Sequence, residues 1–423
     1  MNFREYKLGE IADFNKSSIS KSEIIKDIIY LDTGSITENV ISDTITLDIT
    51  EAPSRAQRKV EHHTIIYSTV RPRLKHYGLL ENPRNNLIVS TGFTTIDLKE
   101  ECKGIIDPRF LYLLLTQPII TEYIGNIADT AVSAYPSINS SDISTLTFNF
   151  PDFYIQNTIA DLWESYDKKI TLNRAINHNL EAMAKQLYDY WFVQFDFPNE
   201  EGKPYKSSGG KMVWNEKLKR EIPEGWDISL IKDIATTYSG GTPKSTNIEY
   251  YDNGEIAWIN SGELNSPIIT KTTNYITKCG LENSSAKLYP SNSILVAMYG
   301  ATAGKVSLLT FEACSNQAVC GVIPTIENML YYVYFHISSL YSHFITLSTG
   351  SARDNISQDT IKNILLPIPT RNILKLFDEK IGSIYQTIVN NYQQIDSLTK
   401  QRDELLPLLM NGQVSVNYDL SHD

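Results

Sequence analysis

Two stretches of the chain carry a heptad pattern of mostly apolar positions. In the first, the pattern positions alternate at spacings of four and three residues: Ile159, Trp163, Tyr166, Ile170, Asn173, Asn177, Leu180, Ala184, Leu187 and Trp191. The second repeats this frame 218 residues later: Phe377, Ile381, Ile384, Ile388, Asn391, Ile395, Leu398, Arg402, Leu405 and Leu409. A narrow seam of this spacing is typical of a long helix packed lengthwise against another. The sequence therefore predicts two long helices that pair with each other.

A polar residue interrupts both seams at the same place. Asn173 lies at the middle of the first stretch, and Asn391 occupies that position in the second. In an antiparallel pair the two side chains would meet near the pseudo-twofold axis, where a buried Asn pair fixes the register at some loss of stability. The alternative is that one or both point to solvent. We predict that Asn173 and Asn391 set the register of the helix pair.

The remaining sequence alternates short β-like runs with helical segments, and it does so twice. In the first half, residues 28–31, 64–67 and 87–89 read as strands, and a helix is expected from Pro108 through Ile124. The pattern restarts at Asp227. The aligned pairs are Ile29–Gly34 with Ala257–Gly262, Ile65–Ile66 with Ile294–Leu295, Leu79–Leu80 with Leu308–Leu309, Ser133–Ala134 with Ser351–Ala352, and Pro151 with Pro369. The chain is therefore predicted to be a tandem duplication.

These patterns divide the chain into a series of domains and helices. The expected boundaries are a globular domain at 1–153, a helix at 154–192, a linker at 193–226, a second globular domain at 227–370, a second helix at 371–412 and a tail at 413–423. The expected fold class is mixed α/β (α+β), with two pseudo-symmetric domains whose long helices pair as an antiparallel coiled-coil spacer. The globular halves have drifted while the helix frame kept its register, which indicates two related readers of different targets.

Composition and charge limit the classes of protein to which the chain can belong. With 42% hydrophobic and 21% charged residues, the 423-residue chain fits a soluble protein of more than one domain. Its net charge of −11 argues against a general polyanion binder but allows a local basic surface. The cysteines show no CxxC spacing, and no apolar run is long enough to span a bilayer. We expect reduced thiols in a cytoplasmic protein that stays off membranes.

Local basic residues are the main candidates for a nucleic-acid contact. In the first half they are Arg55, Arg58, Lys59, Arg71, Arg73 and Lys75, set against only Glu51 and Glu61. Lys and Arg contact phosphates, and Arg also reads guanine in the major groove. The second-half candidates are more scattered: Lys244, Tyr299, Lys305, Arg353 and Asn355. The alternative is that these residues belong to an ordinary solvent-exposed surface, which accounts for the presence of most individual arginines.

No catalytic or metal site is predicted. Gly300–Lys305 partly matches a phosphate-binding loop, but one residue is missing between its glycines, and Val306 stands where a Ser or Thr would bind magnesium. Its counterpart, Arg71–His76, lacks glycine. His62, His63 and Asp32 are not at metal-ligand spacing. The chain contains no GxSxG or HExxH motif, and Asn149–Phe153 is not the Asn-Pro-Pro-aromatic signature of an amino-methyltransferase.

Three segments carry a family resemblance. The junction Leu187–Pro198, the stretch from Lys211–Trp214 through Ile222–Trp226, and the motif Ser239–Pro243 resemble the specificity subunit of a Type I restriction–modification enzyme. The resemblance covers essentially the whole chain. It departs at the start of each long helix, where many members have a Pro-rich step ending in Glu-Gln and this chain has Pro151–Gln156 and Pro369–Leu374.

The resemblance implies a non-catalytic DNA reader. Each globular domain would be a target-recognition domain for one half of a split double-stranded target, and the helix pair would set the half-site spacing and dock two methyltransferase subunits. It leaves open whether a motor-nuclease subunit joins. S-adenosylmethionine and ATP would belong to these partners, so no cofactor is expected on this chain. The family gives no fixed set of base-contacting residues, and our choice is Arg71, Arg73 and Lys75 with Tyr299, Lys305 and Arg353.

Helix length is compatible with this function. At ~1.5 Å per residue, a helix from Ile159 to Tyr190 would be roughly 48 Å long. Half-sites on one face of DNA lie about 34–36 Å apart per helical turn. The alternatives are an enzyme, either a nucleotide hydrolase or a methyltransferase, and a scaffold for two partners. The missing motifs weigh against an enzyme, and the divergence of the globular halves weighs against a scaffold.

Overall fold

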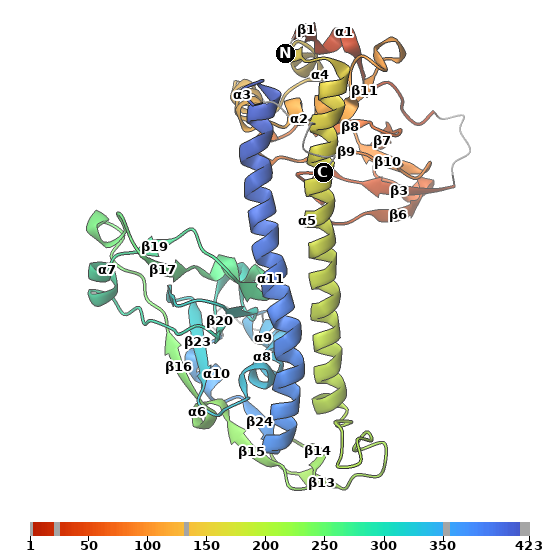
Figure 1. The fold of residues 1–423 in the computed structure, drawn as a ribbon. Coiled ribbons are helices and arrows are strands. Elements are labelled where there is room, and N and C mark those ends of the chain that lie inside the picture. Colours follow the sequence, from red (N-terminus) through yellow and green to blue (C-terminus); the bar gives the residue numbers. More distant parts are fainter. Residues whose placement is uncertain (1–2, 21–25, 131–134, 350–355, 415–423) are drawn as a thin grey trace, which may run out of the picture. The chain divides into compact units, whose positions relative to one another are not determined.

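The computed structural model describes residues 3–20, 26–130, 135–349 and 356–414 (Figure 1). The chain falls into two compact units, of which unit 1 comprises residues 1–169 and 398–423, and unit 2 comprises residues 170–397. Each unit contains a globular part and a portion of both long helices. The units are described one at a time.

Unit 1 contains two four-stranded sheets, with strand orders β6-β3-β10-β7 and β2-β11-β8-β9. β10 is parallel to β3, while the other pairs in these sheets are antiparallel. Two-stranded pairs β1-β12 and β4-β5 complete the described sheets. The strands are β1 (Arg4–Lys7), β2 (Ala12–Phe14), β3 (Asp27–Leu31), β4 (Ile36–Thr37), β5 (Val40–Ile41), β6 (Ile45–Asp48), β7 (Ala56–Lys59), β8 (Ile65–Ser68), β9 (Tyr77–Leu79), β10 (Leu87–Ser90), β11 (Phe93–Leu98) and β12 (Thr147–Phe150).

The helices of unit 1 share one hydrophobic core with the β2-β11-β8-β9 sheet. They are α1 (Leu8–Ile11), α2 (Pro108–Leu115), α3 (Pro118–Asp129), α4 (Ser140–Ser144) and the first part of α5 (Phe153–Tyr188). The prediction of one helix from Pro108 through Ile124 is wrong, because Pro118 has no N–H to continue the helix and starts a new one after a break at Thr116 and Gln117. The strands predicted near 28–31, 64–67 and 87–89 are confirmed as β3, β8 and β10.

Unit 2 repeats this topology with small changes. Its sheets have the orders β16-β23-β20-β21-β18 and β19-β17-β22, with further pairs β15-β24 and β13-β14. The strands are β13 (Met212–Asn215), β14 (Arg220–Pro223), β15 (Asp227–Leu230), β16 (Ala235–Ser239), β17 (Ile256–Ile259), β18 (Ile268–Ile269), β19 (Tyr275–Ile276), β20 (Ser293–Ala297), β21 (Val306–Leu309), β22 (Cys314–Ser315), β23 (Val319–Pro324) and β24 (Leu365–Ile368). The helices are α6 (Ile231–Ile234), α7 (Lys278–Glu282), α8 (Leu330–Ser339), α9 (Tyr341–Thr349), α10 (Gln358–Lys362) and most of α11 (Arg371–Met410).

Strand register confirms the duplication. Ile65 pairs with Leu79 between β8 and β9, and Ile294 pairs with Leu308 between β20 and β21. Both residues of the second pair lie 229 positions after those of the first, as the sequence alignment predicts. The parallel pair β3-β10 likewise has its counterpart in β17-β22. The aligned residues 133–134 and 351–352 lie outside the described part of the chain.

The two long helices are antiparallel within each unit. In unit 1, Ile159 and Trp163 of α5 share one core with Leu406 and Leu409 of α11 and with the globular part. In unit 2, Phe192 lies 4.7 Å, centroid to centroid, from both Phe377 of α11 and Tyr332 of α8. Apolar seam residues of both helices therefore lie in these cores, and the ends of the seams also anchor the globular parts. The tandem mixed α/β fold with paired helices is confirmed.

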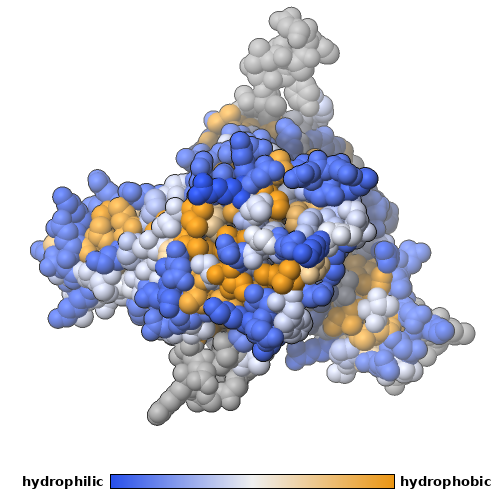
Figure 2. Space-filling view, turned by 90° about the horizontal axis from the view of Figure 1, so that it is seen from below, coloured by the Kyte–Doolittle hydropathy of each residue, from blue (hydrophilic) through white to orange (hydrophobic). Residues whose placement is uncertain are grey.

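The segment that follows α5 is ordered rather than an open linker. A π-helical turn, Asp189–Val193, ends the helix, and the β13-β14 hairpin lies within the predicted 193–226 linker. Asp196 accepts hydrogen bonds from the backbone N and the Oγ of Ser207, which closes the loop between them. Exposed apolar side chains of this segment include Val193, Val213 and Trp214. Figure 2 shows apolar residues at the surface among polar ones on the face seen from below.

None of the described helices is both long and apolar enough to cross a membrane. The predicted boundaries at 153/154, 192/193, 226/227, 370/371 and 412/413 follow the sequence pattern and stay predictions.

Candidate nucleic-acid interface

Hydrogen bonds join four loops at one edge of the unit 1 sheets. The backbone N of Thr91 donates to Arg55 O at 2.8 Å, that of Thr69 donates to Gly92 O at 2.9 Å, and that of Arg71 donates to Pro136 O at 2.9 Å. We call this edge, residues 53–55, 69–71, 90–92 and 135–138, the unit 1 loop surface. Arg55 and Arg71 are exposed on it. The sequence spreads these residues over more than eighty positions, and the fold brings them together.

Arg71 has the most unusual backbone of the surface. Its φ of 49° and ψ of 59° place it in the left-handed region, which costs a non-glycine residue of order 1–3 kcal/mol. Its guanidinium lies 4.7 Å from the centre of the Tyr135 ring, and both side chains are exposed. A flat cation held on an aromatic face keeps its donors directed outward. Tyr135 was not among the predicted residues.

Arg73 and Lys75 are held differently from Arg71. Arg73 donates to Glu122 at 3.1 Å, to Asp129 at 2.7 Å and to Asn126 at 2.6 Å, all on α3. Lys75 donates to Glu38 at 2.6 Å. Carboxylates thus already neutralise both cations, so phosphate contact would require these bonds to break. The assignment of Arg73 and Lys75 to DNA contact stays a prediction. In the structure both side chains stabilise the loop that carries Arg71.

The other predicted cations of unit 1 lie on β7. Arg58 is half-buried, its Nη1 lies 3.4 Å from Ser18 Oγ, and its buried Nε has no partner among the described atoms. Lys59 is also half-buried and has an interaction of its own. Nearby, burial lowers the pKa of His63, so this ring adds no positive charge near neutral pH. Arg55 and Arg71 therefore remain the exposed candidates for base contact in unit 1.

Unit 2 has the same loop backbone with different side chains. Arg71 and Lys75 in the left-handed region correspond to Gly300 (φ 79°) and Gly304 (φ 81°), each 229 positions later. Both loops therefore have left-handed backbone at these two positions, which glycine adopts at no steric cost in unit 2. Between these glycines lies a 3₁₀ turn, Gly300–Thr302, and strand β21 begins at Val306. A phosphate-binding loop needs a following helix, so the structure excludes that assignment.

The predicted residues of unit 2 are only partly gathered. Tyr299, beside the loop, is 37% exposed, and Lys305 donates to Asn265 at 2.5 Å. Lys244 is exposed after the Ser239–Pro243 motif. Arg353 and Asn355 lie outside the described residues. The structure places Tyr299 and Lys305 on one loop, while their roles stay predictions.

The histidine pair and Asp32 have separate partners. His62 and His63 stack at 3.7 Å between ring centroids, and Asp32 instead accepts a hydrogen bond from Tyr30 at 3.0 Å. Among the described residues, no group of three or more His, Cys, Asp or Glu side chains is placed to hold a metal ion.

The polar pair of the helix seam differs from the prediction in one partner. Asn391 donates to Asn177 at 2.8 Å, whereas Asn173 donates to Gln394 at 3.2 Å. Pairing of Asn173 with Asn391 is therefore wrong. Asn173 and Asn177 lie one helical turn apart on the same seam, and the antiparallel register brings the second of them to Asn391. Asn177 and Asn391 are buried, while Asn173 is half-buried.

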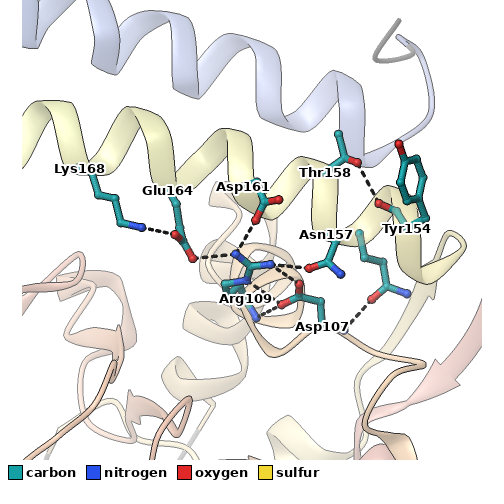
Figure 3. Close-up of polar contacts among 9 residues, drawn as sticks. Asp107, Arg109, Tyr154, Asn157, Thr158, Asp161, Glu164 and Lys168 are labelled. Carbon is teal, nitrogen blue, oxygen red and sulfur yellow. Dashed lines mark hydrogen bonds and ion pairs between the residues drawn. The ribbon is translucent and has the colours of Figure 1, made fainter. Parts of the chain in front are cut away.

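A cluster that sequence reasoning missed fastens the unit 1 globular part to α5 (Figure 3). Arg109 of α2 donates to Asp107 and Asp161 at 2.7 Å, to Glu164 at 2.8 Å and to Asn157 at 2.6 Å. Hydrogen bonding to Asp107 is the main cause that raises the pKa of Arg109. The side chain is only 14% exposed. The sole signal in the sequence was the Asp107-Pro108 helix start, because the helix α5 partners lie about fifty residues away.

Comparisons with known proteins identify a family. A family model described as "Type I restriction modification DNA specificity domain" matches residues 1–182 and again residues 223–405. The chain is 27% identical over 464 residues to the Type I restriction enzyme HindI specificity subunit of Haemophilus influenzae, covering 98% of this chain and 100% of that protein. It is 26% identical over 355 residues to the MjaIX specificity subunit of Methanocaldococcus jannaschii, covering 83% and 78%.

A solved structure shows the same fold. The Type-I restriction-modification system S subunit from M. genitalium matches with a TM-score of 0.58 and 14% sequence identity, covering 96% of each chain. Together, the two matches to the family model cover most of the chain, including the globular parts of both units. The chain therefore belongs to the family of Type I restriction–modification DNA specificity subunits.

Proposed function

We propose that this chain is the DNA-reading subunit of a Type I methyltransferase complex and has no catalysis of its own. The loop surface of unit 1 reads one half of a split double-stranded target, and the corresponding loops of unit 2 read the other half. Family membership supports the general role. Arg55 and Arg71 supply outward donors suited to guanine edges and phosphates.

One observation carries the proposal beyond family membership. The loop Arg71–Lys75 keeps the left-handed backbone that its counterpart Gly300–Gly304 forms with glycine. Glycine is the unstrained choice at position 71, so the exposed guanidinium there implies a role other than stability, whereas Lys75 is held by Glu38. On a surface loop beside an aromatic ring, nucleic-acid contact is the function that needs such side chains.

The long helices supply the second part of the function. The α5–α11 pair sets the gap between the half-sites, with Asn177 and Asn391 fixing its register. Exposed apolar side chains after α5, including Val193 and Trp214, support a docking role for this region. Two methyltransferase subunits dock there and bring S-adenosylmethionine. Whether a motor-nuclease subunit with ATP also joins is left open.

Genome-wide mapping of DNA methylation tests the proposal. Cells would express the chain together with the methyltransferase that co-purifies with it, and control cells would express the methyltransferase alone. The expected result is a methylated motif of two short half-sites around a fixed gap, present only with this chain. If a complex forms and no new motif appears, the chain is a scaffold and the proposal fails.

A further inference from the structure

A turn next to the loop surface has changed its chemistry between the two units. In unit 1 the turn between β10 and β11 is Thr91–Gly92, and in unit 2 the turn between β22 and β23 is Asn316–Ala318. Both turns bond to the loop that carries the left-handed residues. Thr69 N donates to Gly92 O at 2.9 Å, and Met298 N donates to Ala318 O at 2.7 Å. Thr91 and Gln317 are therefore equivalent positions on equivalent surfaces.

The neighbour of this turn also differs. In unit 1 it is Arg55, whose carbonyl accepts from Thr91. In unit 2 the glycine pair that follows β16 borders this turn, with Gly240 N donating to Val319 O at 3.0 Å and Gly241 N donating to Ser315 O at 2.8 Å. A Cβ on Gly240 would lie 2.1 Å from the carbonyl oxygen of Asn316, so the approach requires glycine. This close packing brings the next residue, Thr242, to Gln317.

Gln317 is an exposed amide whose direction is fixed. Thr242 Oγ1 donates to Gln317 Oε1, which leaves one lone pair of that oxygen and the Nε2 hydrogens free for a ligand. The neighbouring amides are used within the fold, since Asn316 donates to Asn260 at 3.3 Å and accepts from Ala318 N. Lys244 is exposed two residues beyond Thr242. The turn therefore presents one oriented side-chain amide, that of Gln317, and the cation Lys244 lies near Thr242 in the sequence.

The chemistry of this amide selects one base. Adenine presents an acceptor at N7 beside a donor at N6 in the major groove, and a side-chain amide matches both at once. Guanine presents two acceptors, which an arginine matches and an amide does not. We infer that Gln317, held by Thr242, reads an adenine in the half-site bound by unit 2. This assignment rests on the proposed function.

Methylation mapping of variants tests the inference. Gln317→Ala is expected to relax one A·T pair in one half-site, lowering discrimination there by about 5- to 150-fold, while the other half-site stays unchanged. Gln317→Glu should shift the preference at that position toward cytosine, because a carboxylate accepts from cytosine N4. Thr242→Val should weaken discrimination at the same position to a smaller degree. Glu327→Gln, an exposed residue beyond the other end of β23, is the control and should leave the motif unchanged.

Several outcomes would overturn the assignment. An unchanged motif with Gln317→Ala means that the amide does not read a base. Relaxation at a G·C pair means that adenine is wrong. Lost methylation together with a lowered melting temperature means that the Thr242–Gln317 bond is structural. The absence of any split motif with the unmodified chain would instead be a failure of the proposed function.

Discussion

Asn391 donates a hydrogen bond from its Nδ2 to Oδ1 of Asn177, with the two atoms 2.8 Å apart in the seam between α5 and α11. Asn177 donates in turn to the carbonyl of Ile388 at 3.3 Å. Asn177 is 2% exposed and Asn391 is 9% exposed, so water cannot readily replace a lost hydrogen-bond partner of either side chain. A slip of one turn would break this bond, and in one direction it would bring Asn391 to the half-buried Asn173 instead, so the pair favours the register in which both buried amides are bonded to each other.

The pair should contribute specificity at the expense of stability. Replacing Asn177 and Asn391 together by Leu is expected to raise the free energy of unfolding, because apolar contacts replace a desolvated polar pair. Asn391→Leu alone should lower it by about 1–3 kcal/mol, because it removes the donor to the buried Oδ1 of Asn177. Asn173→Leu is the control, with an expected change within about 0.5 kcal/mol. Chemical denaturation measures all three.

Spin labels on α5 and α11 within unit 2 would report the register of the same variants. The double variant should give a broader distribution of label distances than the unmodified chain. A more stable double variant with one narrow distance would show that the register is set elsewhere in the seam.

The Arg109 cluster should be a stability determinant of unit 1. Arg109→Met leaves the carboxylate of Asp107, which is 4% exposed, without its cation, and leaves Glu164, which is 18% exposed, with Lys168 alone. Breaking such a buried pair typically lowers the free energy of unfolding by about 3–5 kcal/mol. Lys168→Met removes the same charge from a 68% exposed partner of Glu164 and should change it by at most about 0.5 kcal/mol. If Arg109→Met and Lys168→Met lower the free energy of unfolding equally in thermal and chemical melts, only the lost charge matters and the burial of the pair does not.

The sequence allowed prediction of periodic features and missed those that depend on tertiary contacts. The heptad frames and the 229-residue strand offset were readable because period and duplication are properties of the sequence itself. The choice between Asn173 and Asn177 was not readable, since both lie on one seam and only the packed register separates them. Arg109 was missed for the same reason, because its carboxylate partners on α5 lie about fifty residues away.

The candidate site shows the same division. The correspondence of the Arg71 and Gly300 loops was found by alignment, but the left-handed backbone at Arg71 was not, because no glycine marks it. Arg73 looked equivalent to Arg71 in sequence, and only the structure shows its donors bound to α3. Gln317 lies in a short turn between two apolar runs. Its candidacy as a base-contacting residue depends on the hydrogen bond from Thr242, which the sequence does not show.

His336 should make unit 2 sensitive to acid. Its Nε2 lies 3.3 Å from the carbonyl of Leu365 and its Nδ1 lies 3.2 Å from the hydroxyl of Tyr188, so the neutral ring joins α8, β24 and α5. Burial lowers the pKa of His336 to about 4. The unfolded chain, with an ordinary pKa of about 6.5, binds this proton first as pH falls. Stability from this group is therefore complete above pH ~6.5 and is lost as pH falls toward ~4, by roughly 2–3 kcal/mol.

Melting temperatures measured between pH 7 and pH 4 would check this. The unmodified chain should lose more stability across the window than His336→Gln, whose amide does not titrate. Parallel curves for the two proteins would mean that the histidine is solvated or already charged when folded.

Arg71→Gly separates the loop's strain from its function. Glycine adopts the backbone of Arg71 without steric cost, so the free energy of unfolding should stay unchanged or rise by up to about 1 kcal/mol. Affinity for the split target should fall by about 1–3 kcal/mol, with relaxation at one guanine, because the guanidinium over Tyr135 is gone. Arg73→Ala removes an equal charge but breaks the bonds to Glu122 and Asp129, so it should lower stability and weaken all target sequences alike. Calorimetry of the purified chain and binding titrations of the methyltransferase complex at fixed salt would measure both. If Arg71→Gly loses stability and keeps its sequence preference, Arg71 is a structural residue and the loop is not the reader.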